Sequence, residues 1–252
     1  MKFICLLFFT SFVYSQDTLR VISIGDPYTV DSIEYEILKN TISIYNNRNK
    51  KSVYIELDTI KNFERILNEL RTSTSHSLLA MASITRTKER QAFLDFSSIY
   101  FPSKEVIISK KSPYPLSIRN LKNKPVGYQA NSIEELSIER IASKIPIVKI
   151  PFVSYQEKVT ALLNDVITFS IDDNVAVWDQ PNLQIIHELE HQNGDGIAFA
   201  YPKGSKLKNR LDKYLRYYLK SAKFYNLIEQ KYSAEIARYF RRNLMRINHL
   251  ED

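Results

Sequence analysis

The sequence is poor in the residues that cross-link a chain or hold a metal ion or a phosphate. It has one cysteine, Cys5, in 252 residues, which excludes an internal disulfide and a zinc site built from several cysteines. Its five glycines do not form the closely spaced pattern of a phosphate-binding loop. Neither a nucleophile elbow nor a nucleic-acid-binding motif is present. We therefore expect no cofactor, no metal and no nucleic-acid partner.

Residues 1–15 have the composition of a secretory signal peptide. Lys2 supplies a positive charge, residues 3–9 are apolar, and residues 13–15 precede a plausible cleavage point. The apolar run is too short for a permanent membrane helix, and no second run is long enough to span a bilayer. Because Cys5 lies inside this segment, we expect a soluble periplasmic protein without thiols. A lipid anchor would need a cysteine at the cleavage point, where the sequence has Ser15 and Gln16.

The chain is basic, with 35 lysines and arginines against 28 acids and a net charge of +7. Part of this charge falls on a predicted C-terminal helix that carries Arg238, Arg241, Arg242 and Arg246. Such a helix is typical of a solvated face, but it could also dock on an acidic partner or a membrane surface.

Strand-like and helix-like segments alternate along the chain. Segments with strand composition are 19–24, 53–57, 78–84, 105–109, 125–129, 147–152, 166–171 and 197–201. Helical patterns lie between most of them, and the residues after 207 are helical throughout. The alternation predicts an α/β fold in two units, about 17–108 and 112–193, with a cleft between them where a small ligand would bind.

Several stretches resemble a known family in the same order. Residues 83–90 read SITRTKER, 94–97 read LDFS, 121–129 read LKNKPVGYQ and 196–199 read GIAF. Together with residues 211–232 they resemble the bacterial extracellular solute-binding proteins of family 3, the polar amino-acid binders of ABC importers.

The resemblance implies a two-lobed periplasmic-binding fold, in which each lobe is a mixed sheet flanked by helices and two hinge crossings join the lobes. Its implied boundaries are 17–108 plus 197–232 for lobe one, 109–196 for lobe two and 233–252 for a basic helical tail. The implied function is closure on a small polar ligand, an amino acid or related carboxylate, without catalysis. The implied partner is the membrane subunit of an ABC transporter, and we expect a monomer.

On lobe one, the resemblance points to Arg90 as the group that receives a ligand carboxylate. A guanidinium matches a carboxylate with two parallel hydrogen bonds. Ser83 and Thr85 fall where the family offers backbone and hydroxyl groups to the ligand. Asp26 and Tyr28 follow the first strand, near the point where an aromatic covers the ligand side chain. Each of these residues could instead serve as an ordinary surface, turn or core residue.

On lobe two, Asn131 and Ser132 open a helix whose free N–H groups favour an anion. The family usually has Gly-Thr here, so Asn131 must adopt whatever backbone angle the glycine took. Gln129, just before, could reach the cleft. Asp172 stands where the family carries an aspartate that pairs with the ligand ammonium, while Asp173 could cap the next helix.

Three positions depart from the family pattern, namely His76, Asn131 and Ile167. They indicate a divergent member, whose ligand the resemblance does not name.

Residues 187–191 read His-Glu-x-x-His, the pattern of a zinc protease. That chemistry needs His187 and His191 one turn apart on a helix, with Glu188 activating a zinc-bound water. Residues 183–186 instead have the composition of a strand, and the longer form of the motif would need a histidine at Ile197. The sequence therefore favours a charged strand end or loop.

Two other functions are compatible with the same fold. One is an envelope sensor or regulatory module without a transport role. The other is a dehydratase of cyclic amino-acid precursors, for which Glu134 or Asp172 could serve as the general acid.

Overall fold

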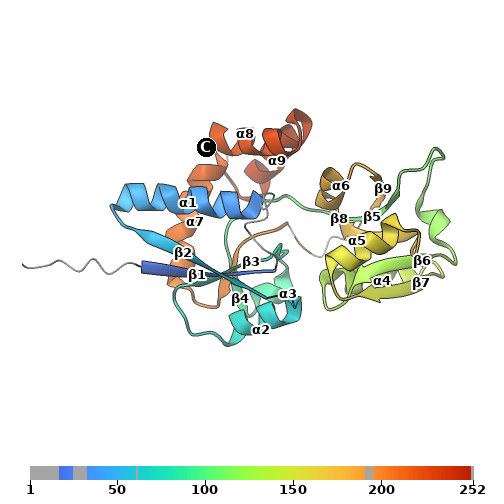
Figure 1. Ribbon diagram of the computed structural model, residues 1–252, viewed down its shortest axis with the longest axis horizontal. Helices are drawn as coiled ribbons and strands as arrows, with labels where there is room; N and C mark the ends of the chain where they lie inside the picture. Colours follow the sequence, from blue (N-terminus) through green and yellow to red (C-terminus); the bar gives the residue numbers. More distant parts are fainter. Residues whose placement is uncertain (1–16, 25–32, 61, 191–193, 195, 251–252) are drawn as a thin grey trace, which may run out of the picture.

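The computed structural model describes residues 17–24, 33–60, 62–190, 194 and 196–250. The predicted signal peptide, Asp26, Tyr28 and His191 lie outside these residues. The described chain forms two lobes, each a mixed sheet with helices packed on it (Figure 1). The predicted α/β class and two-lobed architecture are confirmed.

The first lobe is built on a sheet in which late and early segments interleave. Its strand order is β2 (Val53–Thr59), β1 (Asp17–Ser23), β3 (Leu78–Met81), β10 (Ala200–Pro202) and β4 (Leu94–Phe96). β1 runs parallel to β2 and β3, whereas β10 is antiparallel to β3 and β4. The helices of this lobe are α1 (Ile33–Asn49), α2 (Phe63–Thr72), α3 (Lys88–Gln91), α7 (Lys206–Leu219), α8 (Ala222–Lys231) and α9 (Ala234–Ile247).

The second lobe is built on a sheet whose strands are contiguous in the sequence. Its order is β7 (Val148–Phe152), β6 (Pro125–Gln129), β8 (Phe169–Asp173), β5 (Glu105–Lys110) and β9 (Leu183–Glu188). β6 runs parallel to its neighbours β7 and β8, and β5 runs antiparallel to its neighbours β8 and β9. Its helices are α4 (Ile133–Ala142), α5 (Tyr155–Leu163), α6 (Val175–Asp179) and the 3₁₀ turn η1 (Ile118–Leu121).

The packing differs from the sequence-based boundaries at two places. β5 pairs with β8 and β9, so residues 105–108 belong to the second sheet rather than the first lobe. Five of its six residues are buried, as expected of a strand covered on both faces. α9 is not a separate tail, because Phe240 and Leu244 on its apolar face are fully buried in the first-lobe core. Its arginines lie on the opposite, exposed face.

The chain leaves the first lobe after β4 and returns after β9. Near the return, Ile197 forms bridges with both Thr85 and Phe101, and the amide of Arg86 donates to the carbonyl of Gly196 at 2.8 Å. These bonds fix the loop that follows β3 against the returning segment.

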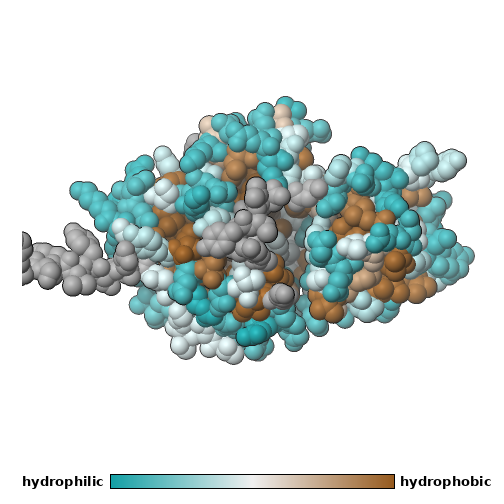
Figure 2. Space-filling model, viewed as in Figure 1, coloured by the Kyte–Doolittle hydropathy of each residue, from teal (hydrophilic) through white to brown (hydrophobic). Residues whose placement is uncertain are grey.

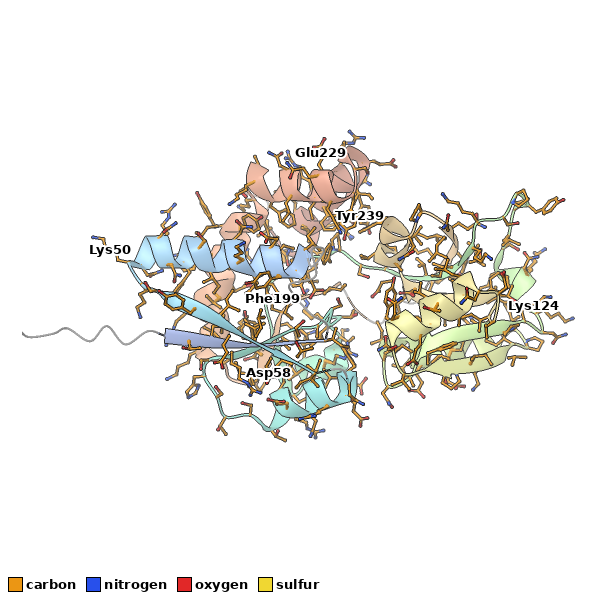
Figure 3. The ribbon with its side chains drawn as sticks, in the orientation of Figure 1. Lys50, Asp58, Lys124, Phe199, Glu229 and Tyr239 are labelled. Carbon is orange, nitrogen blue, oxygen red and sulfur yellow. The ribbon has the colours of Figure 1, made fainter. Side chains whose placement is uncertain are left out.

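Aromatic side chains join the lobes on the side of α9. The Trp178 ring of α6 lies 5.6 Å from the rings of Tyr239 and Phe240, and the Tyr239 hydroxyl donates to the Pro102 carbonyl at 3.1 Å. Figure 3 places Tyr239 where α9 faces the second lobe, and Phe199 inside the first lobe. Figure 2 shows apolar groups scattered among polar ones on the viewed face. Within the described ranges, no helix has the length and apolar character needed to span a bilayer.

Candidate functional site

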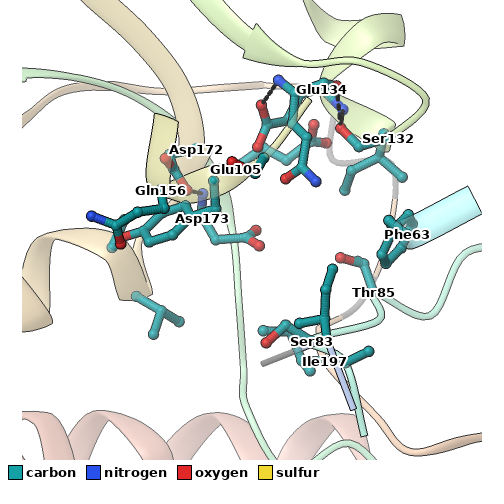
Figure 4. A pocket seen from close by; sticks show the side chains of 18 of the residues that line it. Phe63, Ser83, Thr85, Glu105, Ser132, Glu134, Gln156, Asp172, Asp173 and Ile197 are labelled. Atoms are coloured by element: carbon teal, nitrogen blue, oxygen red, sulfur yellow. Dashed lines mark hydrogen bonds between the residues drawn. The ribbon is translucent and has the colours of Figure 1, made fainter. Parts of the chain in front are cut away.

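A cavity of about 570 Å³ lies between the lobes and is lined by both of them (Figure 4). Cavities of this size hold small ligands. Its first-lobe wall includes Phe63, Ser83, Thr85 and Arg90, and its second-lobe wall includes Glu105, Gln129, Ser132, Glu134, Asp172 and Asp173.

The first-lobe wall is the loop between β3 and α3. Ser83 has a positive φ of 49°, and its hydroxyl donates to Glu34 Oε1 at 2.6 Å. Burial raises the pKa of Glu34, and its bonds from Ser83 oppose that rise. Thr87 caps α3 by accepting from the backbone amide of Arg90 at 3.1 Å, and the side chain of Arg90 lines the cavity.

The Arg90 guanidinium is buried without an ionic partner among the described residues. Its Nη1 donates to the Thr85 carbonyl at 3.0 Å, and its Cζ lies 5.2 Å from the centroid of the Phe63 ring. Burial lowers the pKa of Arg90 to about 10, and the charges of Glu89, Asp173 and Glu105 act against that fall. A guanidinium with most of its donors unused is suited to a carboxylate.

The second-lobe wall begins at the N-terminus of α4. Ser132 caps this helix, since its hydroxyl accepts from the amide of Glu134 at 3.1 Å and donates to the Gln129 carbonyl at 2.7 Å. Asn131 has a positive φ of 58°, the conformation expected where a glycine would otherwise stand. Asn131 does not line the cavity, and its backbone N–H donates to Glu135 Oε2 at 3.1 Å.

A fully buried lysine lies behind this wall. The Lys158 ammonium is 2.6 Å from Glu134 Oε1, 3.1 Å from Asp172 Oδ2 and 2.8 Å from the carbonyl of Ile171. Burial raises the pKa of Glu134 to about 8, although Lys158 pulls it down. Burial alone would lower the pKa of Lys158, but Asp172 and Glu134 raise it. Lys158 therefore stays charged beside these two carboxyl groups.

Two more carboxylates face the cavity. Asp173 Oδ1 accepts from the Ser103 hydroxyl at 2.6 Å, and Glu105 Oε1 accepts from the Ser137 hydroxyl at 2.7 Å. Burial raises the pKa of Asp173 to about 7, with further contributions from Asp172 and Glu105. This wall is rich in carboxyl groups and faces the arginine of the first lobe.

The structure brings together six of the residues predicted from the sequence. Ser83, Thr85, Arg90, Gln129, Ser132 and Asp172 line one cavity, whereas Asn131 stands outside it. Asp26 and Tyr28 fall outside the described residues. Sequence reasoning missed the ring of Phe63, the carboxylate of Glu105 and the lysine behind the wall. A lysine on the buried face of α5 was the available signal, since Lys158 is flanked there by buried Val159, Ala161 and Leu162.

The His-Glu-x-x-His segment does not have the helical geometry of a zinc protease over its described part. His187 and Glu188 lie in strand β9, where His187 pairs with Ile107. In the described part of the chain, no group of three or more histidine, cysteine, aspartate or glutamate side chains is placed to hold a metal.

Two lobes that enclose a cavity of this size have the architecture of a ligand-binding protein. Residues 39–235 match the bacterial extracellular solute-binding proteins, family 3, and the chain belongs to this family. The predicted family is confirmed, and it is a family of binding proteins.

Three relatives illustrate the likeness. The arginine-binding extracellular protein ArtP of Bacillus subtilis is 40% identical over 57 residues, 23% of this chain and 22% of that one. The glutamine-binding protein of Geobacillus stearothermophilus is 27% identical over 128 residues, 48% of this chain and 47% of that one. The chain thus matches less than half the length of these two relatives. The L-arginine-bound substrate-binding protein AbpA of Streptococcus pneumoniae is 25% identical with a TM-score of 0.68, covering 87% of this chain and 96% of that one.

Proposed function

We propose that this protein is an exported, periplasmic receptor that closes on an amino acid or related carboxylate and delivers it to an ABC importer without catalysing a reaction. The observation that carries the proposal is the buried Arg90 guanidinium, which faces a wall of carboxylates across a cavity of about 570 Å³. A molecule with a carboxylate at one end and a cation at the other complements both walls.

The ligand carboxylate meets Arg90 first, with the Thr85 hydroxyl beside it. The second lobe then swings in and brings Ser132, at the N-terminus of α4, and the carboxylates around Asp172. Closure about two connecting segments is the usual motion of such lobes. The exposed Val153 and the Phe63 ring border the cavity from opposite lobes and would lose water on closure.

The acidic second-lobe wall also favours ligands that carry a further positive charge. Four carboxyl groups line the second-lobe wall, Glu105, Glu134, Asp172 and Asp173, whereas the nearby cations are Arg90 on the first lobe and Lys158 behind the wall. A basic amino acid would reduce this imbalance. Two of the relatives are an arginine-binding and a glutamine-binding protein, which supports an amino acid of this size as the ligand.

The test is isothermal calorimetry with a panel of amino acids and small carboxylates. Removing a charge-assisted bidentate contact should weaken the tightest ligand by about ten- to hundredfold in Arg90→Met. Arg65→Met is the matched control, because Arg65 is exposed on α2 and does not line the cavity. If no member of the panel binds the unaltered protein, the proposal fails. If binding survives Arg90→Met unchanged, this arginine is not the carboxylate site.

A sensor role is the second candidate, and the exposed arginines of α9 favour it. One of them, Arg241, lies over the Tyr225 ring at 4.4 Å, and the others project from a helix whose opposite face is buried. Deleting residues 233–252 would remove part of the core, so Arg238→Ser/Arg242→Ser is the proper probe. If this variant loses an envelope partner that the unaltered protein captures while ligand affinity is unchanged, the sensor role is supported. If the variant captures the partner as well as the unaltered protein does, the sensor role is contradicted.

A further inference from the structure

The helix α9 lies almost entirely beyond residues 39–235, the part of the chain that matches the family. It is nevertheless fixed to the first lobe. Phe240 and Leu244 are fully buried in the first-lobe core. Directly after the helix, the side chain of Asn248 makes two hydrogen bonds of 2.8 Å to the backbone of Ile99. When the lobes move relative to one another, α9 therefore moves with the first lobe.

The same helix contacts the second lobe through aromatic rings. The ring of Trp178 in α6 lies 5.8 Å from that of Tyr232 and 5.6 Å from those of Tyr239 and Phe240. The side-chain amide of Asn174 donates to the Tyr239 hydroxyl at 3.3 Å. We call these five residues the α6–α9 interface. Ring pairs at such distances and inclined angles attract one another beyond the apolar area that they bury.

The second-lobe side of this interface is the back of a cavity wall. Asn174 and Trp178 contact α9, and the residues between and before them line the cavity, namely Asp172, Asp173, Val175 and Ala176. A single short segment thus has one side on the ligand cavity and the other on α9. Any movement of this wall toward the first-lobe residues of the cavity also changes its distance from α9.

The α6–α9 interface and the cavity lie on opposite sides of the two segments that connect the lobes. In Figure 1, α6 and α9 lie above these segments, whereas the ends of α2, α4 and α5 that line the cavity lie below them. The Tyr239 hydroxyl marks the boundary, since it donates to the carbonyl of Pro102 in the outgoing segment at 3.1 Å. A rotation about the connecting segments that narrows one side widens the other. Closing the cavity therefore draws Trp178 away from Tyr239.

We propose that the α6–α9 interface holds the lobes apart, and that Tyr239 is a positioning residue which sets ligand affinity without touching the ligand. Contacts made only in the wider form reduce the population of the closed form, and the apparent dissociation constant rises by the same factor. This inference rests on the proposed ligand-binding function. It assigns control of affinity to a helix that lies outside the family match.

The binding test is calorimetry of Tyr239→Ala with L-arginine and L-glutamine as probes. Tyr239 does not line the cavity, so the change leaves the ligand contacts in place. Because an aromatic pair contributes a factor of about two to ten, the variant should bind whichever probe the unaltered protein binds about two- to tenfold more tightly. Unchanged or weaker binding overturns the inference.

Met245→Ala is the matched control. Met245 is on the same helix and is also half-buried, but it packs on the first-lobe core. This variant should lose stability and keep the affinity of the unaltered protein. An equal gain in affinity in Met245→Ala also overturns the inference, because general loosening of α9 would then explain the result.

If Tyr239→Ala does not fold, Tyr239→Phe takes its place. It keeps the ring and removes the hydroxyl, with its hydrogen bonds to Asn174 and Pro102. Binding should then tighten by about two- to fivefold. Unchanged or weaker binding in this variant counts against the inference in the same way.

A second measurement needs no ligand. Spin labels on Arg65→Cys in α2 and Thr160→Cys in α5, both exposed positions, report the separation of the lobes by pulsed electron paramagnetic resonance. Cys5, the one native cysteine, is replaced by serine. Adding Tyr239→Ala should shift the ligand-free distances toward shorter values, and an unchanged distribution overturns the inference. If no amino acid binds the unaltered protein, the proposed function fails, and the distances alone decide whether α9 holds the lobes apart.

Discussion

Replacing Arg90 by methionine should make the ligand-free protein more stable while it weakens ligand binding. Methionine has a similar length and can pack on the Phe63 ring, which lies 5.2 Å from the guanidinium carbon. Methionine is uncharged, so its burial requires no ionic partner. The substitution therefore separates the energetic cost of holding a buried cation from its use in recognition.

The magnitude follows from the pKa of Arg90, which burial lowers to about 10 from an ordinary value above 12. A fall of that size is equivalent to about 3 kcal/mol against the charged form in the folded state. Because the pKa is lowered, this cost is fully present below about pH 10 and disappears only in stronger alkali. The bond to the Thr85 carbonyl and the ring contact return about 1–2 kcal/mol. The net gain in Arg90→Met is therefore about 1–2 kcal/mol.

The assay is urea unfolding at pH 7 without ligand, with thermal melting as a second readout. A gain of 1 kcal/mol raises the melting temperature of a chain of this size by about 2–4 °C. Arg90→Lys serves as a control, because it keeps a buried charge and should show no gain. A loss of stability of about 1 kcal/mol or more in Arg90→Met would refute the reasoning, since the guanidinium would then be part of what holds the lobe together.

Three further predictions concern the scaffold. Burial raises the pKa of Glu134 to about 8, so the folded state favours its protonated form. The stability that this group contributes is lost as the pH rises from about 4.5 to 8. In Glu134→Gln, the free energy of urea unfolding should therefore depend less on pH between pH 5 and 8.5. Gly196→Ala should destabilise by about 2–3 kcal/mol, because φ is +141° and a Cβ would lie 2.4 Å from a backbone oxygen. Gly204→Ala, with a φ of +78° and open space around it, should lose only about 1 kcal/mol in the same unfolding assay. Phe240→Ala should lose about 3–5 kcal/mol and Arg242→Ala less than about 0.5, as measured by thermal melting, because Phe240 is fully buried and Arg242 is exposed.

Each of these has an outcome that contradicts it. A Glu134→Gln protein with the same pH profile as the unaltered one would mean that this carboxyl does not titrate in the range. Equal losses at the two glycines would remove the steric argument. A mild effect of Phe240→Ala would mean that α9 contributes little to the first-lobe core.

The fold could be predicted from the sequence where local pattern and burial coincide. The alternation of strands and helices indicated two α/β units, and short apolar runs marked most of the strands. Position in the sheet was harder to predict. β5 was assigned to the first lobe because it follows that lobe in the sequence, whereas its pairing with β8 and β9 is decided by contacts about 65 and 80 residues away.

The binding site, too, could be predicted only where its residues form a local pattern in the sequence. Arg90 and Thr85 fall in the short contiguous stretch 83–90, whose resemblance to the family pointed to both residues, and the structure places both at the cavity. Their role in binding stays a prediction. Lys158 gave only a weak signal, its place on the apolar face of α5, because a lysine in a helix is usually solvated. The ion pairs with carboxyl groups of α4 and β8 are long-range contacts, which no local pattern reveals.

The place of β10 in the first sheet has a consequence for the order in which the lobes form. β4 joins its sheet through β10, and α7, α8 and α9 supply much of the core around it. The second sheet uses only residues 105–188, a continuous piece of chain. The second lobe can therefore complete its hydrogen-bonded sheet while the first still lacks a strand. From this topology we expect the lobe that holds Arg90 to complete its sheet after the second lobe has folded.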